Sequence, residues 1–209
     1  MKIGIINYGS GNLSAFVNVF KSLDKESVIV VNSKDLDTCS HILMPGVSAW
    51  DTTMKCVENF RDALIHSVFI QKKPFLGVCV GMQILASLSE EGNCQGLNWI
   101  HGDVKKLPSD QVLQNNNFNG PKLPHMGWNT LSSIKKSELT KGLSEKSEFY
   151  FLHSYFFDAA NRDNIIAISE HNSFEFPVIV QNENIFGVQF HPEKSHNSGK
   201  TILNNFAQL

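Results

Sequence analysis

Phe75-Leu76-Gly77-Val78-Cys79-Val80-Gly81 decides the fold, because it joins a short apolar strand to a helix through a turn with a cysteine at its tip. Glycine residues two positions before and after a nucleophile are typical of a nucleophile elbow. A residue at such a turn adopts strained dihedral angles, and its neighbours must be small for the backbones to pass. We expect Cys79 at the end of a strand, with the N–H groups of the next helix favouring its thiolate. The alternative is that Cys79 is a small buried apolar residue.

Strands and helices alternate around this elbow. Short apolar strands are predicted over residues 2–7, 28–31, 42–44 and 75–78. Apolar residues at helical spacing predict helices after residue 12, across Met54 to Leu64, and over 82–88. Alternation of this kind predicts βαβ units and a parallel sheet.

After residue 98 the pattern changes to consecutive strands. They are predicted near 98–107, 125–131, 149–157, 164–169, 177–181 and 184–190, several of them antiparallel, before a final helix from about 195 to 208. Residues 109–122 are predicted to form a surface loop. The sequence therefore predicts an α/β fold with a mixed central sheet flanked by helices, in a single domain over 1–209.

The composition is that of a folded protein without a nucleic-acid or membrane partner. Of the 209 residues, 42% are apolar and 18% are charged, and the net charge is -2. Scattered charges give no basic field that would attract nucleic acid or an anionic membrane. No apolar run approaches the roughly 20 residues that span a bilayer, and residues 1–7 are too few for a signal peptide. Four cysteines without a Cys-x-x-Cys pair indicate a reducing cytoplasm.

A base and an orienting carboxylate for Cys79 are found near the C-terminus. The stretch Gly187-Val188-Gln189-Phe190-His191-Pro192-Glu193 places a histidine at the end of an apolar strand, with a glutamate two residues later. If the chain stays extended, both side chains point to the same side. His191 would then take the thiol proton and Glu193 would orient the imidazole, as in a catalytic triad. Alternatively, the pair is an ordinary exposed strand end.

Five further histidines show no comparable setting. His41, His66, His101, His171 and His196 are interpreted as ordinary surface or half-buried residues. No histidine, cysteine or aspartate cluster has metal-ligand spacing, so neither a metal nor a cofactor is expected.

Together, the motifs at 77–83 and 187–195 resemble the class I, triad-type glutamine amidotransferases. Within that family the chain is similar to the glutaminase subunit of imidazole glycerol phosphate synthase, over nearly its whole length. Further motifs that carry the resemblance lie at Tyr8–Asn12, Leu43–Gly46, Pro124–Asn129 and Phe149–Tyr155. The resemblance implies a flavodoxin-like glutaminase domain that works when docked on a (β/α)8-barrel synthase and channels ammonia to it for histidine biosynthesis.

The resemblance also assigns roles to matching positions. Cys79 would attack the glutamine amide, with His191 as base and then acid and Glu193 as orienter. The glutamine head group would be held by Gln83, Glu91, Ser154 and Tyr155. The oxyanion donors would come from Gly46, Val47 and Val80. The partner face would include Asn12, Trp128 and Lys194.

Some of these residues also have structural explanations. Gln83 could be a polar helix residue one turn past Cys79, and Trp128 could be a core aromatic. Tyr8–Asn12 superficially suggests a phosphate loop, but it lacks the third glycine of the dinucleotide fingerprint, so a tight turn explains it better.

The chain departs from the family pattern at Ser48, where the oxyanion loop usually has glycine, and at Val80, where leucine is common. If a peptide must flip in that loop, Ser48 would restrict it, because serine adopts positive φ less readily than glycine. These features, with Trp99 and His196, also resemble a paralogous branch that supplies ammonia for amidino groups on bacterial surface sugars. Hydrolases of γ-glutamyl peptides and a non-catalytic binding subunit are further alternatives.

Overall fold

Eight strands form one mixed sheet through the computed structural model, which describes residues 1–9, 11–108 and 123–209. The loop predicted over 109–122 lies outside the described residues. The strand order is β2-β1-β3-β4-β13-β12-β11-β8. Strands β2 to β13 in this order are parallel, and β12, β11 and β8 continue the sheet antiparallel. The order of the first five strands is that of flavodoxin-like sheets, so the predicted α/β fold is confirmed.

The strands of the large sheet are β1 (Ile3–Ile6), β2 (Ser27–Val30), β3 (His41–Met44), β4 (Phe75–Val78), β8 (Ser133–Ile134), β11 (Ile165–His171), β12 (Phe174–Asn182) and β13 (Ile185–Val188). Every residue of β1, β3, β4 and β13 is buried, as expected for parallel strands that are covered on both faces.

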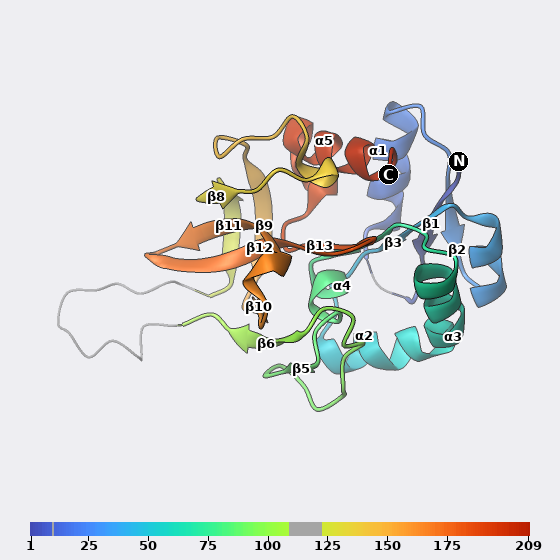
Figure 1. Cartoon of the computed structure of the whole chain (residues 1–209), viewed down its shortest axis with the longest axis horizontal. Coiled ribbons are helices and arrows are strands. Elements are labelled where there is room, and N and C mark those ends of the chain that lie inside the picture. The colour runs from blue at the N-terminus through green and yellow to red at the C-terminus, as the bar shows by residue number, and fades with distance from the viewer. Residues whose placement is uncertain (10, 109–122) are drawn as a thin grey trace.

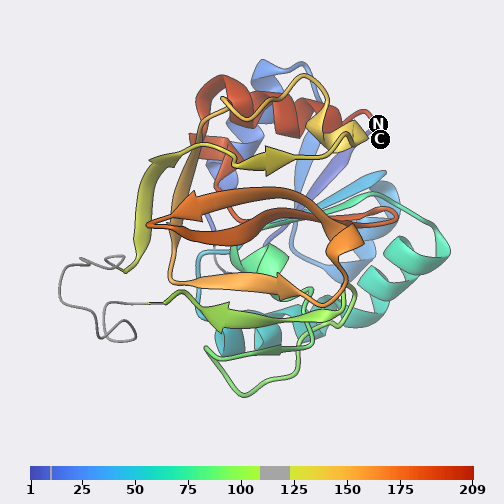
Figure 2. The same ribbon diagram turned by 60° about the vertical axis from the view of Figure 1, so that its left-hand side comes forward.

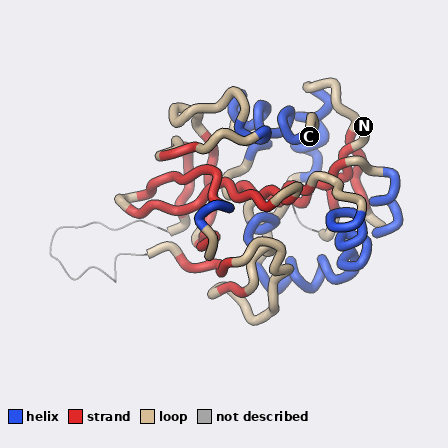
Figure 3. Tube along the Cα trace, viewed as in Figure 1, coloured by secondary structure: helices blue, strands red, loops and turns tan. Residues whose placement is uncertain are grey.

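Helices cover both faces of the parallel half (Figure 1). The helices α1 (Leu13–Ser22) and α5 (His196–Phe206) pack together on one face, and α2 (Trp50–Val57), α3 (Arg61–Ile65) and α4 (Val80–Gln83) lie on the other. A π-helical turn, η3 (His66–Ile70), extends α3, and the 3-10 turns are η1 (Ser33–Thr38), η2 (Glu58–Phe60), η5 (Glu138–Thr140), η6 (Arg162–Asn164) and η7 (Pro192–Lys194). Figure 3 shows the helices gathered around the parallel strands, while the other end of the molecule is mostly strand.

Two small sheets extend that outer end. One has the order β10-β6-β5, from β10 (Tyr155–Ala159), β6 (Gly102–Lys106) and β5 (Leu88–Ser89), and Figure 2 shows it alongside the large sheet. The other is an antiparallel pair of β7 (His125–Asn129) and β9 (Phe149–His153).

Three strand and helix predictions need correction. The helix predicted over 82–88 is only α4, because the carbonyls of Ile84, Leu85 and Ala86 accept hydrogen bonds from residues 97–100 and so cannot continue the helix. The strand predicted over 149–157 divides at Ser154 into β9 and β10, which belong to different sheets. The two-residue strands β5 and β8 are too short to give a periodic pattern and were not predicted.

Candidate active site

The elbow at Cys79 has the strained geometry that the sequence predicts. Cys79 lies between β4 and α4 with φ 55° and ψ -112°, in the positive-φ region that few non-glycine residues adopt. A Cβ added at Gly77 would collide with the Gly81 carbonyl, and one added at Gly81 would collide with the Met44 carbonyl. The elbow is therefore possible only because both flanking residues are glycine.

The helix after the elbow contributes less than expected. We expected a helix over 82–88 to favour the thiolate through its dipole, but α4 has only four residues. A single turn sums few peptide dipoles. A favourable environment for a thiolate at this position therefore depends mainly on neighbouring side chains.

Strand β13 brings those side chains to Cys79. It lies parallel to β4, with Gly77 opposite Gly187 and Val78 opposite Val188, and the Cys79 N–H donates to the Val188 carbonyl at 2.8 Å. Because parallel strands end at the same edge, the residues after Val188 reach the cysteine. The backbone of His191 is held from the other side, where its N–H donates to the Tyr150 carbonyl at 2.8 Å.

His191 and Glu193 form a buried pair. His191 Nδ1 is 2.9 Å from Glu193 Oε1, and each side chain is only 2% exposed. The expectation of an extended chain is wrong, because Pro192–Lys194 forms the 3-10 turn η7. The turn nevertheless directs the carboxylate at the imidazole. The alternative of an exposed strand end is excluded by the burial of both groups.

The charge state of His191 is set by its neighbours. Burial by itself lowers the pKa of an imidazole, because it disfavours the charged form. Hydrogen bonding to Cys79 and Glu193, together with their negative charges, outweighs this effect and raises the pKa of His191 to about 10. The proton therefore resides on the His191 imidazole at neutral pH.

A cavity of about 250 Å³ opens beside the sulfur. Its lining comes from the loop before α2, the elbow, and the segment that joins β9 to β10. The lining residues are Val47, Ser48, Ala49, Cys79, Val80, Gln83, Glu91, Leu152, His153, Ser154, Tyr155 and His191. Glu193 lies behind His191 and is absent from the lining.

The four residues predicted to hold glutamine all line this cavity. Gln83 is buried, and its Nε2 donates to the Tyr155 carbonyl at 2.9 Å and to Gln189 Oε1 at 3.1 Å. It is thus more than a polar helix residue. Glu91 accepts a hydrogen bond from the Trp50 N–H at 3.1 Å, and burial raises the pKa of its carboxyl. Ser154 is placed by the division between β9 and β10.

Three polar residues in and behind the site were not singled out from the sequence. Gln189 is fully buried, and its Nε2 lies 3.7 Å from Cys79 Sγ. His153 lines the cavity and pairs with His125 across β9 and β7. Gln189 is two residues before His191 in the same strand-end motif, which was the one available signal for it.

The predicted oxyanion residues surround the elbow. Val47 and Val80 line the cavity, and a Cβ at Gly46 would lie 2.6 Å from the Gly81 nitrogen. Ser48 Oγ is 2.9 Å from Thr53 Oγ1. None of Gly46, Val47 and Ser48 has positive φ in this conformation, so Ser48 is not strained here.

The predicted partner residues lie outside the cavity. Trp128 is 46% exposed and stacks on His196 with ring centroids 4.8 Å apart, so the alternative of a core aromatic is wrong. Lys194 Nζ lies 5.5 Å from the centre of the Tyr150 ring, which also contacts Trp128. Asn12 caps α1, and α1 packs against η7, the turn that contains Lys194.

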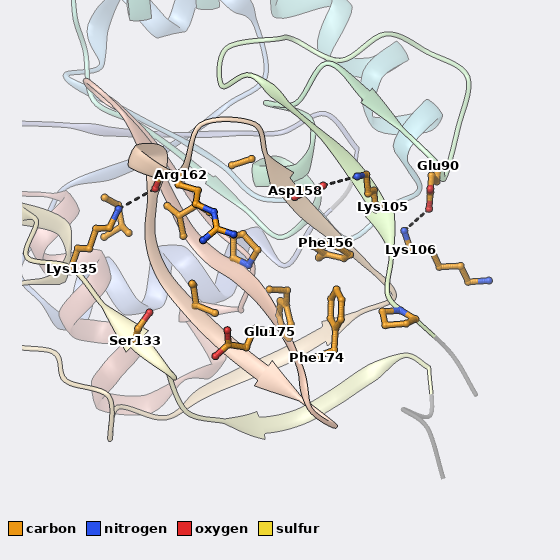
Figure 4. Close-up of a pocket in the computed structure, with 17 residues that line it drawn as sticks. Glu90, Lys105, Lys106, Ser133, Lys135, Phe156, Asp158, Arg162, Phe174 and Glu175 are labelled. Carbon is orange, nitrogen blue, oxygen red and sulfur yellow. Dashed lines mark hydrogen bonds and ion pairs between the residues drawn. The ribbon is translucent and has the colours of Figure 1, made fainter. Parts of the chain in front are cut away.

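A larger groove, of about 720 Å³, lies away from the triad. It runs between β6 and β10 on one side and β11 and β12 on the other, with Phe156 and Phe174 among its apolar residues (Figure 4). Lys105 pairs with Asp158 at 2.6 Å along its edge. The volume of a cavity alone therefore does not identify the active site, because this groove is larger than the cavity beside Cys79.

Within the described ranges, no group of three or more metal-binding side chains could hold an ion. Among the same residues, no helix is both long and apolar enough to cross a bilayer.

The chain belongs to the class-I glutamine amidotransferase family, whose model, described as "Glutamine amidotransferase class-I", matches residues 4–209. It is a glutamine amidotransferase. Curated relatives include "Imidazole glycerol phosphate synthase subunit HisH" of Leptospira borgpetersenii, 46% identical over 99% of this chain and 100% of that protein. The protein of the same name from Bdellovibrio bacteriovorus is 42% identical over the same shares.

Solved structures share the fold at much lower identity. A PurLQS structure from Thermotoga maritima superposes with a TM-score of 0.75 at 16% identity, covering 99% of this chain and 97% of that one. A glutamine amidotransferase from the same organism gives a TM-score of 0.64 at 14% identity, covering 100% of this chain and 83% of that one. These likenesses confirm the fold class.

Proposed function

We propose that the chain is the glutaminase subunit of an imidazole glycerol phosphate synthase, which hydrolyses L-glutamine and passes the ammonia to a (β/α)8-barrel subunit. The observation that carries the proposal is the placement of Cys79 and the His191–Glu193 pair at the ends of the neighbouring strands β4 and β13. Full-length relatives named for that synthase support the histidine pathway over the surface-sugar pathway.

The first half of the reaction forms a thioester. The Cys79 sulfur attacks the side-chain amide carbon of glutamine, and the charge that develops on the amide oxygen is stabilised by backbone N–H groups of Val80 and the Gly46–Val47 loop. The protonated His191 then donates its proton to the leaving nitrogen, so ammonia departs and the acyl group stays on sulfur.

The second half hydrolyses the thioester. The now neutral His191 takes a proton from water, whose oxygen attacks the acyl carbon. Glutamate leaves as the carbon–sulfur bond breaks, and the thiolate and imidazolium return. Glu193 holds the imidazole orientation throughout. Gln83, Glu91 and the Ser154-Tyr155 segment hold the glutamine head group, and Glu91 supplies a carboxylate for the substrate's ammonium group.

The partner face is proposed to include Asn12, Trp128 and Lys194. Exposed Trp128 supports this assignment, because aromatic residues with large exposed area are frequent anchors of interfaces. We also propose that residues 1–209 form one domain, since the large sheet takes strands from both ends of the chain. Four free cysteines, two of them buried, support a reducing cytoplasmic setting.

Replacement of the nucleophile tests the proposal. In the complex with the barrel subunit, Cys79→Ala should reduce glutamine hydrolysis by a factor of about 10⁴ or more, since loss of a covalent nucleophile removes the thioester route. Complex formation and synthesis from free ammonia should remain. Cys56→Ala, at a half-buried cysteine in α2, is the matched control and should keep full activity.

Glutamine turnover that survives in Cys79→Ala would contradict the proposed chemistry. Co-purification of the chain with a sugar-modifying enzyme in place of a barrel synthase would instead contradict the histidine-pathway assignment and leave the chemistry intact.

A further inference from the structure

A pair of buried histidines lies behind the glutamine-binding segment. His125 on β7 and His153 on β9 face each other in the antiparallel register and are 3% and 6% exposed. His125 Nδ1 is 3.0 Å from His153 Nε2. Neither histidine has a role in the proposed reaction, and buried polar rings that pair with each other need an explanation.

The direction of the hydrogen bonds in this pair is fixed by a carbonyl at one end. His153 Nδ1 lies 2.8 Å from the Tyr155 carbonyl, which can only accept, so Nδ1 carries the proton. Burial lowers the pKa of His153 to about 3, so the ring is neutral and its Nε2 is an acceptor. His125 must therefore donate from Nδ1, and its own Nε2 accepts from Asn129 Nδ2 at 3.4 Å.

The same carbonyl receives a second donor from the catalytic side. Gln83 Nε2 donates to the Tyr155 carbonyl, and Gln189 connects Gln83 to the Cys79 sulfur. The Tyr155 carbonyl thus joins two series of hydrogen bonds. One starts at His125 on β7, and the other ends at the sulfur of Cys79. The position of this carbonyl determines how Ser154 and Tyr155 line the cavity.

We propose that His125 is a positioning residue for glutamine binding: it holds His153 in the Nδ1–H tautomer, and His153 with Gln83 fixes the Tyr155 carbonyl and the substrate-binding segment 154–155. This inference rests on the proposed glutaminase function for the role of that segment. His125 does not touch the substrate and acts only through His153.

The tautomer can be tested without any substitution. Long-range proton–nitrogen NMR spectra of the ¹⁵N-labelled full chain at pH 7 distinguish imidazole tautomers, and we expect His153 to be neutral with its proton on Nδ1. A proton on Nε2, or a doubly protonated ring, overturns the proposal. This readout does not depend on glutamine chemistry.

Saturable labelling of Cys79 by 6-diazo-5-oxo-L-norleucine, a glutamine analogue, separates binding from reaction. In the complex with the barrel subunit, His125→Phe keeps an aromatic ring but removes the donor. We expect the half-saturating concentration to rise about fivefold, the effect of roughly one net hydrogen bond, with less than a twofold change in the maximal labelling rate. His125→Gln restores a donor and should recover most of the affinity.

His171→Phe is the matched control for packing. His171 stacks on the His125 ring, with ring centroids 4.1 Å apart, but it is not part of the hydrogen-bond chain to Tyr155. Equal losses of affinity in His125→Phe and His171→Phe would assign the effect to packing and overturn the proposal. If the wild-type chain is not labelled at all, the glutaminase function itself fails, whereas a wrong tautomer with normal labelling removes only the role of His125.

Discussion

His191 and His153 line the same cavity and are both buried, but they hold opposite charge states. His191, at the end of β13, has a carboxylate and a sulfur beside it, and its pKa is raised to about 10. His153, at the end of β9, has a carbonyl and a second imidazole as hydrogen-bond partners, and burial lowers its pKa to about 3. The charge of a buried imidazole in this protein is therefore decided by its neighbours and not by its depth.

The two sides of the cavity also differ in what holds them. On the elbow side, glycines allow backbone segments to touch, and the strained Cys79 is fixed by β4 and β13. On the histidine side, neutral rings and side-chain amides hold the segment 154–155. Rigid backbone thus positions the reacting atoms, and a polar side-chain network positions the region where the substrate is proposed to bind.

The largest effect is expected from the substitution that removes the difference in charge between His191 and His153. Glu193→Gln takes away the negative charge beside His191, so the pKa of His191 should fall and the imidazole should lose its orientation. We expect kcat for glutamine hydrolysis in the complex to drop by about 10⁴-fold, comparable to loss of the orienting carboxylate in other triads. The alkaline limb of kcat/KM should move to lower pH. An alkaline limb at an unchanged pH would show that Glu193 does not set the charge of His191.

The next prediction tests the backbone packing on the elbow side. In Gly81→Ala the new methyl group would meet the Met44 carbonyl, which belongs to a central strand and cannot move away. We expect the free energy of unfolding to fall by about 3 kcal/mol, as for overpacking at a rigid site. Denaturant unfolding measures it. Gly9→Ala is the control for loss of glycine flexibility alone, because Gly9 has a φ of 89° but open space where a Cβ would lie. It should lower the free energy of unfolding by less.

The pKa values of His191 and His125 are shifted in opposite directions, so their contributions to stability depend on pH in opposite ways. For His191 the folded pKa is above the unfolded value, so its contribution is present below pH 6.5 and is lost as the pH rises through about 10. For His125, whose pKa burial lowers to about 4, the contribution is present above pH 6.5 and is lost as the pH falls toward 4.

At pH 5 the loss from His125 amounts to about 2 kcal/mol, since one pKa unit is about 1.4 kcal/mol. Between pH 7 and pH 5, the free energy of unfolding of His125→Phe should therefore fall by about 2 kcal/mol less than that of the wild type. Denaturant unfolding at both pH values measures this difference. The same acid sensitivity in the variant would mean that His125 is already protonated in the folded state.

The smallest expected effect concerns the loop opposite the elbow. Ser48→Gly restores the glycine that is usual in the family, but Ser48 is unstrained and bonds Thr53. We expect the free energy of unfolding to fall by about 1 kcal/mol, from the lost hydrogen bond and the freer unfolded chain. Ser48→Ala, which removes the hydroxyl alone, separates the two contributions. A more stable Ser48→Gly protein would reveal strain at this position.

The sequence predicted the features that depend on local pattern. Apolar runs predicted the parallel strands, and the glycines predicted the elbow at Cys79. Both predictions are possible because a buried parallel strand and a sharp turn each require particular residues in consecutive positions. The two-residue spacing of His191 and Glu193 predicts their pairing, although a 3-10 turn brings the two side chains together where an extended chain was expected.

Features that depend on distant contacts were not predicted. The end of α4 is set by carbonyls that bond residues 97–100, which no helix pattern shows. The His125–His153 pair requires the register of β7 against β9, and Gln189 gains its importance only from Gln83 and Cys79. Trp128 could be core or surface from sequence alone, because a tryptophan suits both.

The pairing of β4 with β13 has a consequence for the newly made chain. The cysteine is synthesised in the first half of the polypeptide, but the strand that delivers its base is inserted between β4 and β12 only when residues 185–193 have left the ribosome. Until then Cys79 lacks His191 as its proton acceptor. Hydrolytic competence is thus acquired only after residue 193 has been made, and a product that is terminated earlier cannot hydrolyse glutamine.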